Sequence, residues 1–283
     1  MPMRVLITGG SGMLGRDVAE AAAEAGHECI PLSHAELDIT DLVEVRAAVR
    51  EAAPDAVINC AAWTDVDGAE NAGEAAAEVN RDGAGNVARA ADEAGAWTVH
   101  VSSDYVFDGT KRTPYVESDQ TNPLSAYGRS KLGGEQAVAA AAPSSHTIVR
   151  SSWLFGVHGR CFPATILRLA AERDHLAVVD DQVGCPTFTG HLAPALLALA
   201  ERRPLGIVHV ASAGACSWYE LAREIVALSG LDCAVEPSTT AEQRRPAPRP
   251  AFSVLGSERR GEAPELPEWR RGLEAYMRVG SRS

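Results

Sequence analysis

Short apolar runs rich in β-branched residues alternate with alanine-rich stretches through the first half of the chain. The apolar runs predict strands near residues 4–8, 28–32, 56–60, 97–102 and 147–150. The stretches between them predict helices near residues 12–25, 41–52, 73–94 and 127–141. An alternation of strand and helix typically builds a parallel sheet with helices on both faces. The expected fold class is therefore α/β, with a doubly wound parallel sheet.

The alternation becomes less regular after residue 151. The pattern there predicts helices near residues 163–172, 190–201, 217–229 and 268–278, and strands near residues 176–179 and 206–210. Residues 242–250 contain three prolines, which remove backbone donors and push their neighbours into extended conformations. This segment therefore cannot form a regular helix, and its composition alone is typical of a surface linker.

Composition narrows the class of protein without naming a reaction. The 283 residues are 46% hydrophobic and 23% charged, which is ordinary for a globular protein with ample material for a core. The net charge of −12 argues against a general binder of nucleic acids or membrane surfaces, which would need a basic surface. The six cysteines form no C-x-x-C pair and no metal-ligand spacing, and no apolar run approaches about 18 residues. We expect reduced thiols, a cytoplasmic protein, no metal and no membrane span.

A glycine-dense turn lies between the first predicted strand and the first predicted helix. Its glycines satisfy both G-x-x-G-x-x-G and, with Gly10, G-x-G-x-x-G. Glycine lets a backbone turn tightly and approach a pyrophosphate, whose charge then lies at the helix N-terminus. The alternative is a simple tight turn. The strand and helix on either side favour a Rossmann-type dinucleotide site formed by Gly9, Gly12, Met13, Leu14 and Gly15.

The end of the second predicted strand bears on the choice of cofactor. An NAD site usually has an acid there that binds the ribose 2′-hydroxyl. Here the strand ends in Pro31–His34, and the first acids after it are Glu36 and Asp38. Ser33 and His34 can bind a 2′-phosphate without repelling it, which favours NADPH, while the lack of an arginine leaves NADH as an alternative. Asp38, with Ile39 beside it, can accept from the adenine amino group or, like Thr40, can cap the next helix.

Tyr127 and Lys131 are four residues apart in a predicted helix, so their side chains share one helix face. A ketone that gains a hydride develops negative charge on oxygen and needs a proton donor there. A free phenol has a pKa of about 10, and a nearby ammonium lowers it by stabilising the phenolate. We expect Tyr127 to be the acid and Lys131 to tune it, with both contacting the cofactor and Lys131 holding the nicotinamide ribose.

Polar residues close several predicted strands at the edge where an open α/β sheet binds its ligands. They are Thr8, Asn59 and the Ser102–Asp104 trio. Ser103 can donate a second hydrogen bond to the carbonyl oxygen and stabilise its developing charge. Asn80 can connect Lys131 to bulk water in a proton relay.

These residues resemble the motifs of the extended short-chain dehydrogenase/reductase family, in the branch that reduces dTDP-linked 4-keto-6-deoxyhexoses. The resemblance covers nearly the whole chain. It is carried by Asn59–Asp67 with Ala69 and Glu70, by Ser102–Gly109, by Arg150–Trp153, by Asp181–Thr187 and by Arg249–Ser253. The strings D-Y-V-F-D-G and D-Q-x-G-x-P-T are specific to this branch.

The resemblance implies a role for individual residues. The catalytic trio would be Ser103, Tyr127 and Lys131, with Ser103 where the family commonly has threonine. The cofactor would contact Ala61, Ala62 and Thr64. The sugar would contact Val66, Asp104, Tyr105 and Trp153, although simple core packing is the alternative for Trp153. Arg249 would approach the nucleotide diphosphate, because a planar guanidinium suits phosphate oxygens.

The same resemblance divides the chain. We expect residues 1–150 to form an NAD(P)-binding Rossmann domain, with elements around 163–210 completing its sheet. Residues 151–162 and 211–283 would form a smaller, mixed C-terminal lobe that binds the substrate. The chain is expected to be a monomer or a weak homodimer.

Three positions depart from the family pattern. Cys161 precedes Phe162 where an asparagine is usual, and Phe252 replaces an asparagine, so sugar or nucleotide contacts could differ. Some relatives dimerise through a magnesium site, but Gly190 occupies the position that would supply an acidic ligand. We therefore expect neither that metal site nor that dimer.

The expected activity is NADPH-dependent reduction of a 4-keto group to give dTDP-L-rhamnose. An epimerase or dehydratase is disfavoured, because a dehydratase needs an Asp-Glu pair where Asp104 is followed by Tyr105. A reductase of another dTDP-deoxysugar, of the dihydrostreptose type, is the close alternative. A non-catalytic NADP-binding regulatory subunit is the third, although such a subunit could lose Tyr127 or Lys131 and this chain has both.

Overall fold

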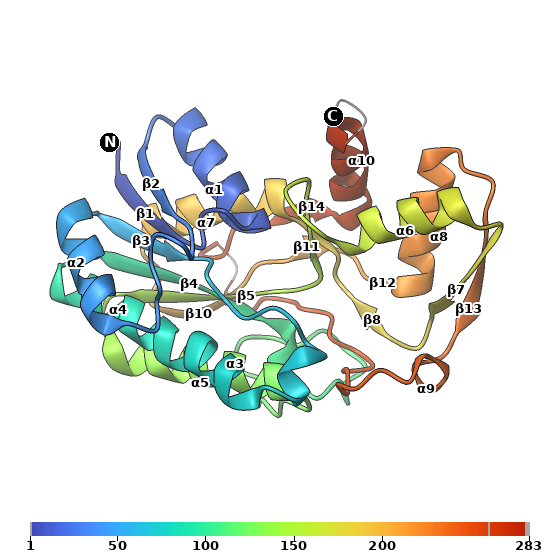
Figure 1. The fold of residues 1–283 in the computed structure, drawn as a ribbon, viewed down its shortest axis with the longest axis horizontal. Coiled ribbons are helices and arrows are strands. Elements are labelled where there is room, and N and C mark those ends of the chain that lie inside the picture. Colours follow the sequence, from blue (N-terminus) through green and yellow to red (C-terminus); the bar gives the residue numbers. More distant parts are fainter. Residues whose placement is uncertain (1, 260, 281–283) are drawn as a thin grey trace.

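The computed structural model describes residues 2–259 and 261–280 and is built around a six-stranded parallel sheet (Figure 1). The strand order is β2–β1–β3–β4–β5–β10. The bounds are β1 Arg4–Thr8, β2 Glu28–Leu32, β3 Ala56–Asn59, β4 Trp97–Ser103, β5 His146–Ser151 and β10 Gly206–His209. The predicted doubly wound α/β fold is confirmed, because all five pairings in this sheet are parallel.

Helices cover both faces of the sheet (Figure 1). One face carries α1 (Met13–Glu24) and α7 (Thr189–Arg202). The other carries α2 (Leu42–Ala52), α4 (Ala84–Glu93) and α5 (Ala126–Ala141). The side chains of β1 point alternately to the two faces of the sheet. Val5 and Ile7 pack in the α1/α7 core, whereas Leu6 packs in the α2/α4 core. This two-residue period explains why a fully buried strand is apolar at every position.

The predicted helix over residues 73–94 is interrupted in the structure. A short helix, α3 (Gly73–Ala77), continues through a π-helical turn at Glu78–Gly83 into α4. A π-helical turn contains an extra residue and re-aims side chains, and such turns are frequent at functional sites. Asn80 lies within this turn.

A second lobe lies beside the carboxyl edge of the sheet, on the right in Figure 1. Its largest elements are α6 (Phe162–Glu172), β7 (His175–Val179), α8 (Trp218–Ser229), β13 (Ala234–Ser238) and α10 (Trp269–Gly280). The shorter elements are β6 (Leu154–Phe155), β8 (Val183–Gly184), β9 (Thr187–Phe188), β11 (Ser212–Ala213), β12 (Cys216–Ser217), α9 (Thr240–Gln243), β14 (Leu266–Glu268) and the 3-10 turns Gly68–Glu70 and Asp104–Val106. The lobe has its own core, formed largely by α6, α8 and α10.

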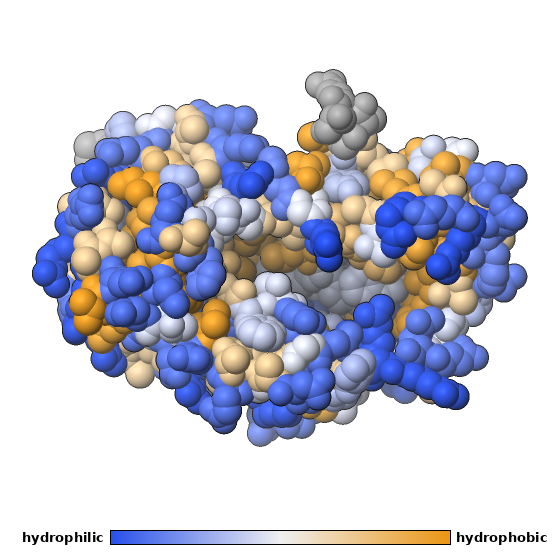
Figure 2. All heavy atoms as spheres, in the orientation of Figure 1, coloured by the Kyte–Doolittle hydropathy of each residue, from blue (hydrophilic) through white to orange (hydrophobic). Residues whose placement is uncertain are grey.

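A return segment, residues 244–255, crosses from the lobe to the sheet domain. It forms isolated bridges from Phe252 to Val183 in the lobe and from Leu255 to Tyr115 in the sheet domain. Figure 2 shows the surface hollowed between the two parts. The proline-rich stretch is not a regular helix beyond α9, as predicted, but it is tied to both parts rather than being a simple linker.

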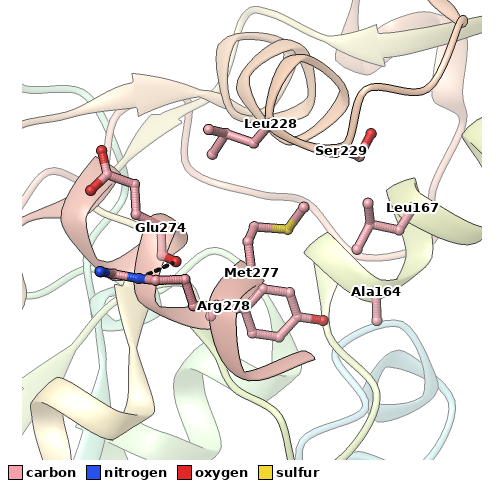
Figure 3. Close-up of a pocket in the computed structure, with 8 residues that line it drawn as sticks. Ala164, Leu167, Leu228, Ser229, Glu274, Met277 and Arg278 are labelled. Carbon is pink, nitrogen blue, oxygen red and sulfur yellow. Dashed lines mark hydrogen bonds between the residues drawn. The ribbon is translucent and has the colours of Figure 1, made fainter. Parts of the chain in front are cut away.

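A groove of about 830 Å³ lies elsewhere, between α6, α8 and α10 (Figure 3). Its lining includes Leu167, Leu228 and Met277, and no residue predicted to bind cofactor or substrate. This groove is therefore separate from the expected site. In the described part of the chain, no helix has the length and apolar character needed to cross a bilayer.

A buried ion pair fastens α5 to the sheet. The Nε and Nη2 groups of Arg150 donate to the two carboxylate oxygens of Glu135 at 2.8 and 2.6 Å. Ser102 Oγ donates to the same carboxylate at 2.6 Å. Both charged side chains are almost completely buried, at 3% and 4% exposed. The pair therefore helps to set the position of the helix that carries Tyr127.

Arg150→Met should lower the free energy of unfolding by about 3–5 kcal/mol, because it leaves the Glu135 carboxylate buried without its cation. Arg168→Gln is the control, since it breaks an exposed pair with Glu172 and should cost less than about 1 kcal/mol. Urea unfolding followed by circular dichroism measures both. Equal effects would show that Arg150 contributes no more than a surface pair.

Candidate active site

The glycine turn lies at the point where the strand order reverses. Strand β1 pairs with β2 on one side and β3 on the other, so the loops after β1 and β3 leave a crevice between them. Gly9 has φ +67°, and a Cβ there would come within 2.7 Å of the Ala61 backbone nitrogen. A side chain at Gly15 would collide with the Gly9 carbonyl oxygen at 2.3 Å. The glycines therefore allow two loop backbones and a helix to meet.

The N-terminus of α1 suits a dinucleotide diphosphate. Gly12 is the N-cap, is exposed, and makes no side-chain capping bond, and the first turn contains no acid. The backbone N–H groups of Met13 and Leu14 lie in this first turn, where an anion interacts favourably with the helix dipole. Leu14 and Gly15 are buried and support the turn. The residues present therefore fit a dinucleotide whose diphosphate is held by this turn.

The loop after β2 adds an acid to the predicted 2′ site. Ser33 donates from its backbone N and from Oγ to the Glu36 carboxylate at 2.8 and 2.6 Å. These hydrogen bonds lower the pKa of Glu36 and keep it charged. A carboxylate this close to Ser33 suits a 2′-hydroxyl better than a 2′-phosphate. His34 is exposed beside it.

Asp38 and Ile39 have structural roles in this loop. Asp38 accepts from the backbone N and Oγ1 of Thr40, which lowers its pKa, and Asp41 rather than Asp38 or Thr40 caps α2. The capping alternative for these two residues was therefore wrong. Ile39 is buried, and its side chain lies against Gly83 of the π-helical turn.

Tyr127 and Lys131 both project from the first turns of α5. Ser125 caps this helix by accepting from the Gly128 backbone N. Lys131 is 3% exposed, donates from Nζ to the Val101 carbonyl at 2.7 Å, and has its pKa lowered to about 8, chiefly by burial. Its ammonium retains further donors. Cys60, at the start of the loop after β3, lies close enough to Lys131 for the two groups to influence each other's pKa, so the amine lies next to the crevice.

Burial raises the pKa of the Tyr127 phenol, and a hydrogen bond with Ser103 opposes the shift. Lys131 is not among the groups that shift this pKa in the protein alone, where its amine donates to the Val101 carbonyl. The neighbouring Asp104 and Tyr105 raise the pKa further. The phenol is therefore a neutral donor that keeps its proton until a base of sufficient strength forms beside it.

Ser103 and Asp104 lie together at the end of β4. Ser103 Oγ donates to Asp104 Oδ1 at 3.0 Å, and Ser152 Oγ donates to Oδ2 at 3.2 Å. Asp104 is 1% exposed, and burial raises its pKa to about 6 although Ser253, Ser103 and Ser152 oppose the shift. Since Ser103 has one proton, it can donate either to Asp104 or to an oxygen beside Tyr127.

In the described part of the chain, the hydrogen bonds of Asn80 go to Trp63 and Ser130 rather than directly to Lys131. Its Oδ1 accepts from the Trp63 backbone N at 2.9 Å, and its Nδ2 donates to the Trp63 carbonyl at 3.1 Å and to Ser130 Oγ at 2.9 Å. Ser130 Oγ in turn donates to the Tyr127 carbonyl at 2.7 Å. Asn80 therefore fastens α5 to the loop that carries Ala61, Ala62, Thr64 and Val66.

Trp153 belongs to an aromatic stack. Its indole is parallel to that of Trp218, with ring centroids 3.5 Å apart. A Cβ at Gly184 would lie 2.4 Å from the Cε2 ring-fusion atom of Trp153, so Gly184 approaches the ring from a face. The backbone of Trp153 has φ 48°, which is strained for a non-glycine residue. The stack leaves the edge of Trp153, rather than a face, for a ligand.

The expected diphosphate residue, Arg249, pairs with a carboxylate. Its Nη1 and Nη2 donate to Oδ1 and Oδ2 of Asp67, each at 3.0 Å. Tyr105 also interacts with Arg249, and its ring packs edge-on against Tyr127 with centroids 5.5 Å apart. A single side chain, that of Tyr105, therefore lies between Arg249 and Tyr127.

The departures from the family pattern have local explanations. Cys161 is the N-cap of α6 and is buried, with Sγ 3.5 Å from the Gly156 carbonyl and 3.7 Å from Tyr276 Oη. Phe252 packs against a small apolar cluster that includes Phe107 and Tyr115. Both side chains therefore serve packing.

Three ligand-type side chains gather beside α1. Asp17, Glu20 and His158 place one candidate ligand atom each within 4.8 Å of one another. His158 Nε2 lies 3.0 Å from Glu20 Oε1 and 3.5 Å from Asp17 Oδ1. The imidazole lies between two acidic side chains of α1 and so fastens the loop before α6 to that helix. Gly190 is the second residue of α7 and, as a glycine, offers no side-chain ligand.

Sequence reasoning gave no role to Asp67, Trp218, Glu36 or Ser152. Asp67 lies within a family-specific string, which was its only signal. Ser152 likewise lies within the string Arg150–Trp153 that carries the resemblance, whereas the contacts of Glu36 and Trp218 depend on loop geometry or on distant segments, and no local motif marks them.

Comparisons with known proteins agree with this geometry. The family model for the RmlD substrate binding domain matches residues 3–281. A probable dTDP-4,6-dihydroxy-2-methyloxan-3-one 4-ketoreductase from Streptomyces antibioticus is 45% identical, over 97% of this chain and 95% of its own length. A dTDP-4-dehydrorhamnose reductase from Mycolicibacterium smegmatis is 45% identical, over 97% of this chain and 85% of its own length.

The structural comparison gives the same result. A crystal structure of dTDP-4-dehydrorhamnose reductase from Bacillus anthracis in complex with NADP has a TM-score of 0.95 at 37% identity, and the match covers 99% of this chain and 100% of that chain. The chain therefore belongs to the RmlD family of extended short-chain dehydrogenases/reductases, the branch that contains the dTDP-4-dehydrorhamnose reductases.

Proposed function

We propose that this chain is an NADPH-dependent reductase that converts dTDP-4-dehydro-L-rhamnose to dTDP-L-rhamnose. The observation that carries the proposal is the meeting of three groups at one edge of the sheet: the glycine turn, the buried Lys131 and the pair formed by Tyr127 and Ser103. The names of the relatives and the NADP bound to the Bacillus anthracis protein support it.

Bound NADPH would supply the hydride that reduces the sugar C4 carbonyl. As negative charge develops on the carbonyl oxygen, Tyr127 transfers its phenolic proton there, completing the addition of a hydride and a proton. Ser103 donates a hydrogen bond to the same oxygen, which stabilises the charge before the proton arrives. Lys131, still mostly protonated near neutral pH, stabilises the phenolate that remains and holds the nicotinamide ribose.

The cofactor is held by the groups that the glycine turn exposes. Gly9, Gly12, Met13 and Leu14 face the diphosphate, and the loop after β3 brings Ala61, Ala62 and Thr64 along the dinucleotide. The Glu36 carboxylate beside Ser33 lets NADH compete with NADPH to some extent, because it favours a 2′-hydroxyl.

The sugar would contact Val66, Asp104, Tyr105 and the edge of Trp153. A second candidate substrate, another dTDP-linked 4-keto-6-deoxyhexose, is favoured by the similarity to the Streptomyces antibioticus 4-ketoreductase. The chemistry at Tyr127 is the same for both. A turnover assay with both keto sugars, read by NADPH absorbance and product identity, separates them, and turnover without net NADPH loss would contradict a reductase of either kind.

Tyr127→Phe should lower kcat by about 10²- to 10⁴-fold, because it removes the proton donor while keeping the ring. The dissociation constant for NADPH should change little. Steady-state kinetics and fluorescence titration measure the two quantities. Near-normal turnover would remove Tyr127 from its proposed role.

Glu36→Gln should raise the ratio of kcat/KM for NADPH to that for NADH by about tenfold, since it removes a negative charge beside the 2′-phosphate. Ser33→Arg should shift the ratio in the same direction by adding a phosphate-binding cation. Glu24→Gln, at the C-terminal end of α1 and so opposite the dinucleotide turn, is the control and should leave the ratio unchanged. If neither site variant moves the ratio, the 2′ site lies elsewhere.

The kcat/KM for the keto sugar should fall as the pH drops through about 6, the pKa to which burial raises Asp104, because only the carboxylate can accept from two sugar hydroxyls. Asp104→Asn should lower kcat/KM at pH 8 and remove this inflection. The same raised pKa makes the charged form costly to the fold, so the variant should gain stability relative to wild type as pH rises from about 4 to 6. An unchanged inflection would assign it to another group.

A further inference from the structure

The carboxylate of Asp67 collects donors from a distant part of the chain. Both Nη groups of Arg249 donate to it at 3.0 Å, the Ala247 backbone N donates to Oδ1 at 3.1 Å, and Arg245 Nη1 donates to Oδ2 at 3.3 Å. A planar guanidinium that meets both carboxylate oxygens is held in orientation as well as in position. Asp67 therefore fixes the return segment at three of the five residues 245–249.

This junction joins the loop after β3 to the return segment that leads from the lobe. Asp67 precedes the 3-10 turn Gly68–Glu70 in the loop after β3, the loop that Asn80 holds against α5 through Trp63. Arg249 lies in the return segment, which is bridged to the lobe at Val183. One carboxylate thus connects the cofactor side to the lobe side.

The local charge is positive although the chain is acidic. Two guanidinium groups share one carboxylate, which leaves an excess of one positive charge in a protein whose net charge is −12. Arg249 is 14% exposed and Arg245 is 60% exposed. A partly desolvated cation next to a cleft is well suited to an anion such as a diphosphate.

The orientation of Arg249 leaves a donor for that anion. Asp67 takes one N–H from each Nη group, and the Ala247 carbonyl accepts another from Nη1 at 2.9 Å. A guanidinium has five N–H groups and Tyr105 hydrogen-bonds a fourth, so one N–H remains for a further acceptor. Tyr105, which touches Arg249 on one side and Tyr127 on the other, places this N–H within one side chain of the proposed acid.

We infer that Asp67 is a positioning residue for substrate recognition: it holds Arg249 across the cleft so that the guanidinium is ready to bind the diphosphate of the nucleotide sugar. The inference rests on the proposed function for the identity of the anion. Asp67 does not touch the ligand, and it acts by removing the rotational freedom of a long side chain before the ligand arrives. Arg245 contributes charge at the exposed rim.

Asp67→Asn tests the inference in the full-length protein, with dTDP as the binding probe and the keto sugar as the substrate. The dissociation constant for dTDP and the KM for the sugar should each rise by about tenfold or more. The KM for NADPH should be unchanged, and kcat at saturating sugar should stay within about threefold. Asp67→Glu, which keeps the charge, should recover part of the loss. Asp65→Asn makes the same chemical change two residues away and should have no effect on dTDP binding.

A double-substitution cycle identifies the path through Arg249. Arg249→Lys keeps the charge but loses the planar fork, so it should weaken dTDP binding to a similar extent. The double variant should bind no more weakly than either single variant, because both changes remove one unit. Additive losses would overturn the inference. Urea unfolding of each variant checks the fold, and Arg249→Lys supplies the test if Asp67→Asn does not fold.

Other outcomes also decide the matter. Tighter dTDP binding by Asp67→Asn would show that Asp67 competes with the ligand for Arg249. If the affinity for NADPH and the kcat fall as much as the affinity for dTDP, Asp67 has only a general structural role. If the wild type binds dTDP about tenfold better than Asp67→Asn but reduces no keto sugar, the inference stands and the proposed function fails. If the wild type reduces the sugar but both proteins bind dTDP equally, the function stands and the inference fails.

Discussion

The close approach of two loop backbones at the ends of β1 and β3 is the constraint on which the site depends. Gly9 reaches the Ala61 backbone only because it has no side chain and can adopt a positive φ. This contact fixes the start of α1, and it also places the residues after β3 beside Lys131. A larger residue at Gly9 would push the loops apart and would separate the dinucleotide turn from the catalytic helix. The same contact therefore positions both the diphosphate-binding groups and the groups that handle the proton.

Helix α5, which carries Tyr127 and Lys131, lies among ionisable groups whose burial costs free energy. Lys131 and Asp104 are nearly buried, and burial shifts the pKa of each toward its neutral form. The Glu135–Arg150 pair and the Asn80 amide form hydrogen bonds that hold α5 close to these buried ionisable groups. Rigid neighbours of this kind let unfavourable charges persist at a defined place, which is the condition for electrostatic stabilisation of a developing oxyanion. The stability of the surroundings and the reactivity of the site are thus two aspects of one arrangement.

The sequence predicted the sheet well because its signals are local. The bounds of β1 and β2 are those that the apolar runs indicate, although only β1 is buried along most of its length and β2 is a partly exposed edge strand. The glycine spacing and the four-residue interval between Tyr127 and Lys131 are also short-range patterns. By contrast, Asp67 and Arg249 are 182 residues apart, and Trp218 meets Trp153 only after the lobe has folded. The π-helical turn at Asn80 likewise has no distinct periodicity, so a continuous helix was predicted and the contacts of Asn80 were missed.

In the proposed function the lobe selects the sugar, and its contacts explain why chemistry and specificity can vary separately. Tyr127, Ser103 and Lys131 stand on the sheet and on α5, whereas Trp153 is set by its stack with Trp218 and by the lack of a side chain at Gly184. A change at Trp218 would move the edge of Trp153 without disturbing the proton donor. Relatives in this family that reduce different keto sugars could therefore share one reaction centre and differ in such supporting residues. The return segment adds the remaining constraint in this proposal, because the Asp67–Arg249 pair sets how far the guanidinium lies from Tyr127 and hence the length of nucleotide sugar that would fit between them.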